Sequence, residues 1–193
     1  SLSRCLRPEK RTGEKDMENI STYCLFCTSG QESKVMEKLK ALGCAPLAPL
    51  VMRWKPEAGS LRKSARRLLP GYVFFDADAE PDWHDIRSHE AVLKILQYDD
   101  GERALRDSDA AFVAWLKKYD GTIEISHAMQ VGTKLEFVDG PLRDMEGKIV
   151  KVNRNRKQVQ VAFGDDKSML RTIWCSVEYI EENTDTDKLR QKC

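Results

Sequence analysis

The segment Val131–Phe163 restricts the possible fold of this chain more than any other part of the sequence. Residues Leu135–Phe137 alternate apolar and polar side chains, which is the period of a half-buried strand. The breaker cluster Asp139–Pro141 follows, and two further strand-forming stretches occupy Lys148–Val152 and Val159–Phe163. The segment therefore predicts three short strands connected by two turns.

The turn before the third strand is basic. Residues 153–156 have the sequence Asn-Arg-Asn-Arg and form a turn candidate, because asparagine tolerates positive φ. No acidic residue lies between Gly147 and Gly164, whereas the bases there are Lys148, Lys151, Arg154, Arg156 and Lys157. A basic hairpin on a small barrel attracts the phosphates of a nucleic acid. The alternative interpretation is an ordinary solvated β-turn.

The order of these features resembles a KOW motif. The matching phrases are VG, an apolar strand, DGPLRDMEG, a second apolar strand, the basic turn and VQV, with Gly147 at the characteristic glycine of the motif. KOW motifs occur in ribosomal proteins and in transcription factors of the NusG family. Two further strands predicted at Met169–Trp174 and Val177–Ile180 would complete a five-stranded SH3-like barrel.

The upstream part of the chain predicts a second, larger unit. Its apolar periodicity and its Gly and Pro breakers give the order β-α-β-β-β-α-β-α. The segments expected to be ordered are Thr22–Thr28, Gln31–Leu42, Pro46–Trp54, Ser60–Leu69, Tyr72–Phe75, Trp83–Ser88, Ala91–Leu96 and Ser108–Lys118. We expect Ser108 to cap the last helix. The predicted fold class is α+β: an N-terminal α/β sandwich, with an antiparallel sheet and flanking helices, followed by the small barrel.

The phrases TYCLFCTSGQESKVMEKL, LLPGYVFF, WHDIRSHEAVLKIL and ALRDSDAAFVAWL resemble the amino-terminal domain of NusG. The resemblance spans about Tyr23–Glu182, although the family usually begins with Trp-Tyr and this chain has Thr22-Tyr23. The short join DGTIEISHAM and the basic turn are similar to the LoaP-type specialised paralogues. We expect a disordered or added leader at 1–20, the first domain at 21–119, a linker at 120–128, the KOW domain at 129–182 and a disordered tail at 183–193.

The resemblance implies a transcription elongation factor that docks on the clamp helices of core RNA polymerase and favours processive elongation. In the family an apolar patch makes this contact, and the matching positions are Tyr23, Leu68, Leu69, Pro70 and Tyr72. A Leu-Leu pair that enters a strand is commonly core, whereas tyrosine combines an apolar ring with a polar tip that suits an interface.

A LoaP-like KOW domain would bind a hairpin in the nascent leader RNA. The residues expected to bind RNA are Arg143, Lys148, Lys151, Arg154, Asn155, Arg156 and Lys157. In housekeeping NusG relatives the same domain binds Rho or the ribosome instead, and that alternative stays open. A ribosome-associated KOW protein is a third hypothesis, but it would require a more basic chain than the net charge of +1.

The two arms around Pro56–Gly59 carry six bases and one acid, Glu57. The bases are Arg53, Lys55, Arg62, Lys63, Arg66 and Arg67. They are interpreted either as a solvated hairpin or as an additional nucleic-acid contact, for example with non-template DNA.

Other features favour a monomeric cytoplasmic protein that is not an enzyme and uses no cofactor or metal. Cys24 and Cys27 have CxxC spacing, but residues three apart on a strand point to opposite faces, so we expect core cysteines. We expect all six cysteines to be free. His84 and His89 are expected on an exposed helix and loop rather than in a metal site. No signal peptide or membrane-length apolar run is visible.

Overall fold

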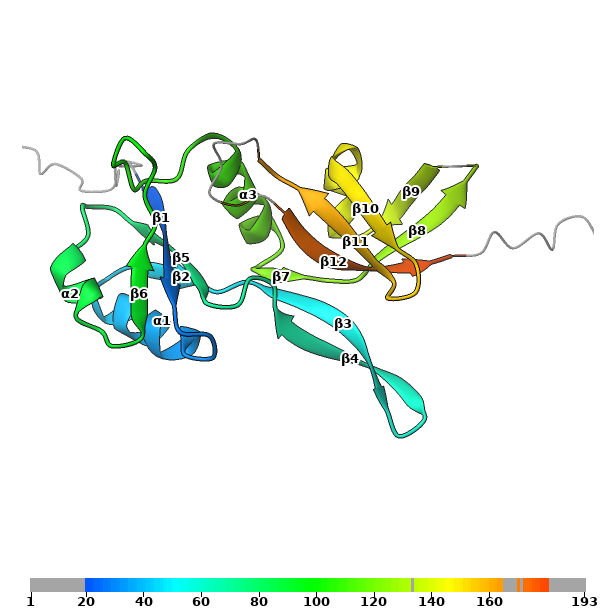
Figure 1. Ribbon diagram of the computed structural model, residues 1–193, viewed down its shortest axis with the longest axis horizontal. Helices are drawn as coiled ribbons and strands as arrows, with labels where there is room; N and C mark the ends of the chain where they lie inside the picture. The colour runs from blue at the N-terminus through cyan, green and yellow to red at the C-terminus, as the bar shows by residue number, and fades with distance from the viewer. Residues whose placement is uncertain (1–19, 133, 165–169, 171, 181–193) are drawn as a thin grey trace, which may run out of the picture.

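In the computed structural model the chain forms two β-sheet units with a helix between them (Figure 1). The structure describes residues 20–132, 134–164, 170 and 172–180. The predictions of a disordered leader and tail, as well as those for Cys5 and Cys193, fall outside the described residues.

The first unit is built on a four-stranded sheet with the order β2-β5-β1-β6. Its strands are β1 (Ser21–Cys27), β2 (Ala45–Leu47), β5 (Tyr72–Ala77) and β6 (Val92–Ile95). Cys24 packs in the hydrophobic cluster on one face of this sheet, whereas Cys27 packs in the cluster on the other face. The two thiols therefore point apart, as the strand period predicts, and the four described cysteines are unpaired.

Helices cover both faces of this sheet. Helices α1 (Glu32–Ala41) and α2 (Trp83–Arg87) contribute Val35, Leu39 and Ile86 to one cluster. Helix α3 (Asp107–Lys118) contributes Phe112, Trp115 and Leu116 to the other cluster. The assignment of Ser108 as the cap of α3 was wrong, because the helix begins at Asp107 after an extended Arg106.

A long hairpin, β3 (Leu50–Glu57) and β4 (Ser60–Arg67), extends away from the first sheet (Figure 1). Strand β7 (Thr122–Ile123) pairs in parallel with the base of β3. The segment that we expected to be a plain linker therefore contains β7 and the start of the next strand. Parallel pairing between residues about seventy positions apart leaves no local pattern in the sequence.

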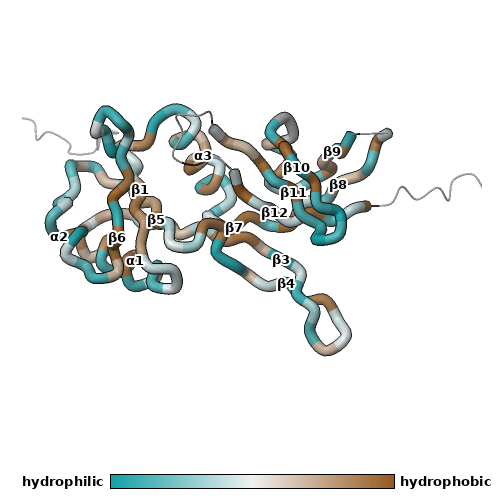
Figure 2. The backbone as a smooth tube through the Cα atoms, viewed as in Figure 1, coloured by the Kyte–Doolittle hydropathy of each residue, from teal (hydrophilic) through white to brown (hydrophobic). Residues whose placement is uncertain are grey.

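The second unit is a five-stranded sheet with the order β10-β11-β12-β8-β9, and it curls into a small barrel-like domain (Figure 1). Its elements are β8 (Ser126–Val131), β9 (Lys134–Asp139), the 3₁₀ helix η1 (Pro141–Lys148), β10 (Ile149–Asn153), β11 (Gln158–Ala162) and β12 (Thr172–Tyr179). One long strand, β12, takes the place of the two strands expected after Phe163, although Met169 lies outside the described residues. Apolar residues occur along strands of both units, and the arms of the β3–β4 hairpin are largely hydrophilic up to a tip that includes an apolar stretch (Figure 2).

Helix α3 joins the two units through apolar and polar contacts. Phe163 from the second unit lies with its ring centroid 4.4 Å from Phe112 and 5.3 Å from Trp115. The indole N–H of Trp115 donates to the carbonyl of Pro141 over 3.2 Å. One hydrophobic cluster consequently runs from the first sheet through α3 into the barrel-like domain.

Polar contacts fix the edges of this interface. The Lys118 ammonium and the Tyr119 hydroxyl each lie 2.7 Å from the Asp144 carboxylate. The Lys118 ammonium and the Tyr119 hydroxyl lower the pKa of Asp144, which therefore stays ionised at neutral pH. The backbone N–H of Leu170 donates to the buried Asp109 carboxylate over 3.2 Å.

Candidate functional site

The bend before β5 has a backbone shape that requires glycine. Gly71 has a φ of +84°, and a Cβ atom there would lie 2.6 Å from the Phe26 ring and 2.8 Å from the carbonyl oxygen of Cys27. The N–H of Cys27 donates to the Gly71 carbonyl over 2.7 Å, and the N–H of Tyr72 donates to the Leu69 carbonyl over 3.1 Å. The bend is therefore held closely against β1.

The Glu32 carboxylate, which is almost completely buried, anchors the same bend. It accepts hydrogen bonds of 2.8 Å from the N–H groups of Gly71 and Gly30, and the Arg67 guanidinium lies 4.0 Å away. Burial alone would raise the pKa of Glu32, but the backbone N–H donors and Arg67 lower it overall. Sequence analysis missed Glu32, because nothing in α1 itself indicates a contact with a bend about forty residues away.

The five residues predicted to dock on polymerase do not form one surface. Tyr23 is 6% exposed and packs its ring against Trp83, while Leu68 is 7% exposed and belongs to the other hydrophobic cluster. Leu69 and Tyr72 are half-buried, and Pro70 is exposed. Of this set, therefore, only Leu69, Pro70 and Tyr72, which lie in the bend, remain partly or fully accessible to solvent.

The basic residues of the β3–β4 hairpin divide between its two faces. The strand register puts Arg53, Lys55, Arg62 and Arg66 on one face, with Lys55 and Arg62 directly opposite each other. Lys63 lies on the other face, above the Trp54 ring and 3.6 Å from Glu124. Arg67 donates to the carbonyl of Ala48 and approaches Glu32, so it serves the fold rather than the surface.

The β10–β11 turn presents its predicted residues to solvent. Arg154, Asn155, Arg156 and Lys157 are all exposed, as is Lys151 on β10. The Asn153 side chain accepts from the N–H of Arg156 over 3.1 Å, and the N–H of Val177 donates to the Lys157 carbonyl over 2.9 Å. Asn153 is thus a structural residue of the turn, and this role was not predicted.

Two of the predicted RNA-binding residues lie elsewhere. Lys148 precedes β10, and its ammonium lies above the ring of Phe163, at the end of the β10–β11 hairpin opposite the turn. Arg143 belongs to η1, beside the interface residue Asp144. The structure therefore groups Lys151 and Arg154–Lys157, and it separates Arg143 and Lys148 from them.

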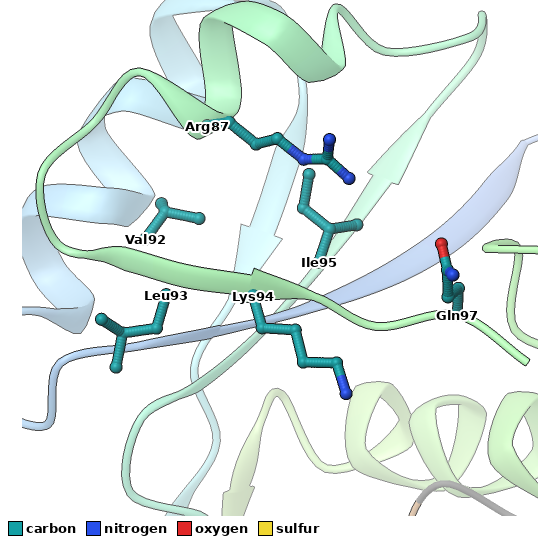
Figure 3. Close-up of a pocket in the computed structure, with 6 residues that line it drawn as sticks. All are labelled: Arg87, Val92, Leu93, Lys94, Ile95 and Gln97. Carbon is teal, nitrogen blue, oxygen red and sulfur yellow. The ribbon is translucent and has the colours of Figure 1, made fainter.

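Among the described residues, no group of His, Cys, Asp and Glu side chains has the arrangement of a metal site. His89 accepts a hydrogen bond from the N–H of Ala91, so its ring stabilises the loop after α2. An open hollow of about 430 Å³ beside β6 is lined by Arg87, Val92, Leu93, Lys94, Ile95 and Gln97, none of which carries a thiol, a hydroxyl or a carboxylate (Figure 3). Within the described part of the chain, no helix has the length and apolar character needed to span a membrane.

Sequence comparisons with known proteins agree on one family. Residues 22–112 match the family model described as transcription termination factor NusG. The transcription termination/antitermination protein NusG of Pseudomonas aeruginosa is 26% identical over 152 residues, covering 72% of this chain and 86% of that protein. NusG of Vibrio cholerae is 25% identical over 152 residues, covering 72% and 84%. A solved structure titled "Domain interaction in Thermotoga maritima NusG" is similar with a TM-score of 0.46 and 22% identity, covering 81% of this chain and 92% of that one.

Proposed function

We infer, because the chain belongs to the NusG family of transcription termination and antitermination factors, that it docks on core RNA polymerase and promotes processive elongation. The first domain would make the docking contact with the clamp helices. A factor that binds the processive conformation of polymerase more tightly than the paused one shifts the population toward elongation. The site of action would be the cytoplasm.

The observation that carries this proposal is the fixed bend at Leu69–Tyr72. Gly71 and Glu32 hold the backbone of the bend in one conformation. Its apolar side chains can therefore bind a partner without the loss of conformational entropy that ordering a flexible loop would require. Pro70 is exposed, and the Tyr72 ring packs at a tilt against the Phe26 ring with a centroid distance of 5.0 Å. Burial raises the pKa of Tyr72, so its hydroxyl remains a hydrogen-bond donor at neutral pH.

The second part of the proposal is that the β10–β11 turn recruits the factor to its operon by binding a hairpin in the leader RNA. The exposed bases of the turn supply phosphate contacts, and Asn155 and Arg156 are available for base-edge hydrogen bonds. An A-form helix has a major groove too narrow for side chains to read. The RNA should therefore contain a bulge or loop that opens this groove.

A protein partner for the second domain is the alternative, and one observation favours it. Val150 and Val152 on β10 are 59% and 40% exposed. Neighbouring exposed valines on an edge strand suit a protein contact such as Rho or a ribosomal protein. In that case the chain would act like a housekeeping NusG.

The docking proposal is tested by capture of core RNA polymerase on immobilised full-length protein. We expect Tyr72→Ala to lower polymerase retention markedly, because it removes a central aromatic contact. Leu93→Ala is the matched control, since Leu93 is a 60% exposed apolar residue on β6. Equal retention by a Tyr72→Ala variant with an unchanged circular dichroism spectrum would overturn the docking assignment.

A further inference from the structure

The second basic segment of the chain, the β3–β4 hairpin, lies next to the basic β10–β11 turn. Sequence separates them by about ninety residues, but the fold brings both to strand β12. In Figure 1, the β10–β11 hairpin crosses β12, and its turn lies on the side of β12 where the β3–β4 hairpin runs.

Contacts along β12 establish this neighbourhood. Strand β3 packs against β12, and the positive charge of Arg53 lies close enough to lower the pKa of the buried Cys175 thiol, although burial dominates and raises that pKa to about 12. Two residues further on, Val177 is hydrogen-bonded to Lys157. At the end of the strand, the charge of Arg154 acts on Tyr179. Residues of both basic segments therefore lie near the part of β12 between Cys175 and Tyr179.

One face of the β3–β4 hairpin carries Arg53 and three further basic residues, and we call it the basic face. Alternation along the strands places Lys55, Arg62 and Arg66 on this face, and all three are exposed. Lys55 and Arg62 are directly opposite each other, and like charges in this position destabilise a hairpin. Glu57 offsets Arg62 only in part, through an exposed ion pair of 3.4 Å. A polyanion bound across the hairpin would relieve this repulsion.

Among the described residues, the acidic groups near the shared surface are already engaged. Glu178 on β12 lies 3.5 Å from His127, which also contacts Asp139 at 2.7 Å. Glu124 lies beside Lys63 on the opposite face of the hairpin. Within the part of the chain that the structure describes, the surface between the hairpin and the turn therefore keeps an excess of positive charge.

We propose that the basic face of the β3–β4 hairpin and the β10–β11 turn form a single RNA-binding surface beside β12. The turn would read the irregular part of an RNA hairpin, while Lys55, Arg62 and Arg66 would bind phosphates along its stem. This proposal rests on the proposed RNA-binding role of the turn. It adds that the first domain takes part, so that the full chain requires a longer RNA than the turn alone.

The test measures binding of a labelled, bulged hairpin from the leader RNA to the full chain over a range of salt concentrations. The hairpin variant combines Lys55→Ala, Arg62→Ala and Arg66→Ala. Each lost phosphate contact reduces the slope of log affinity against log salt by about 0.7–0.9, so the variant should flatten it by about 2–3. Shortening the stem should weaken the wild type but not this variant.

The matched control combines Lys34→Ala, Lys40→Ala and Arg87→Ala, which removes three exposed charges from helices α1 and α2 of the first domain. It should bind RNA with the slope of the wild type. If the hairpin variant also keeps that slope while turn variants weaken binding, the shared surface is wrong and the RNA-binding role of the turn stands. If the wild type binds neither this RNA nor a scrambled one, both proposals fail.

Discussion

Two residues of the first domain, Gly71 and Glu32, decide the shape of the candidate docking surface. Gly71 is needed because the bend has positive φ and lies against the Phe26 ring. Glu32 is needed because its carboxylate satisfies two backbone N–H groups in a buried place. The Pro-Gly pair in LLPGY predicts the bend from sequence. The partner Glu32 is unpredictable, since it depends on how α1 packs on the sheet.

At this scale we predict that Glu32→Gln lowers the free energy of unfolding by about 1–3 kcal/mol at neutral pH, as expected for loss of a charged hydrogen-bond acceptor. The pKa of Glu32 is lower in the folded chain than its ordinary value of 4.5. Its stabilising effect is therefore complete above 4.5 and is lost as pH falls through the folded value. Denaturant unfolding of wild type and variant across this pH range measures the difference.

Glu37→Gln is the control, because Glu37 lies exposed on the same helix. It should leave the stability almost unchanged at every pH. A Glu32→Gln variant whose deficit persists undiminished in acid would show that the charge on Glu32 does not hold the bend.

Among the elements, the β10–β11 turn was the best predicted part of the candidate site. Asn and Arg in alternation, flanked by strand-forming residues, predicted the turn and its exposure. Sequence proximity also suggested that Arg143 and Lys148 would lie with the turn. In the structure, both residues lie apart from the turn. Proximity misled here because η1 and β10 carry the chain from one end of the sheet to the other.

We predict a division of work within the turn. Lys151→Ala or Lys157→Ala should weaken binding to all RNAs alike and flatten the salt dependence by about one phosphate contact. Asn155→Ala or Arg156→Ala should lower the affinity for the cognate RNA hairpin by about 1–3 kcal/mol, by analogy with base readout in DNA. Titration against the leader RNA and a scrambled RNA at two salt concentrations separates the two effects.

Gln158→Ala serves as a control, because Gln158 is a half-buried neutral residue next to the turn. If all four variants weaken cognate and scrambled RNA equally, the turn binds phosphate without reading sequence. If the chain binds neither the leader RNA nor the scrambled RNA and instead binds Rho or a ribosomal subunit, the housekeeping alternative replaces the leader-RNA proposal.

Most individual strands and helices were predictable, because each has a local period or a breaker at its end. The elements that escaped prediction depend on distant partners. Strand β7 exists because Thr122 and Ile123 pair with Leu50 and Val51. The start of α3 at Asp107, where φ is +51°, also escaped prediction, since Ser108 looked like the better cap.

For the whole molecule, the contact between the two domains is the main feature that sequence did not reveal. Phe163 looked like an ordinary inward residue of a small barrel, but it packs on Phe112 and Trp115 of α3. No sequence pattern distinguishes a side chain that faces the interior of its own domain from one that faces a neighbouring domain. The aromatic cluster makes α3 part of both units.

We predict that Phe163→Ala uncouples the two domains and lowers the free energy of unfolding by about 3 kcal/mol, as for a large aromatic removed from a core. Protection of α3 amides from hydrogen exchange should fall as well, because the helix loses cover on one side. Val150→Ala is the control, since Val150 is 59% exposed. A Phe163→Ala variant with unchanged exchange in α3 would contradict a stable domain contact.

The most direct test of the proposed function is single-round transcription with purified polymerase on a template that carries the leader upstream of a terminator. We predict that the wild-type chain raises read-through with the natural leader but not with a scrambled one. Tyr72→Ala should abolish this effect, whereas Leu93→Ala should retain it. Unchanged or reduced read-through, under conditions in which the protein is bound to polymerase, would contradict the account.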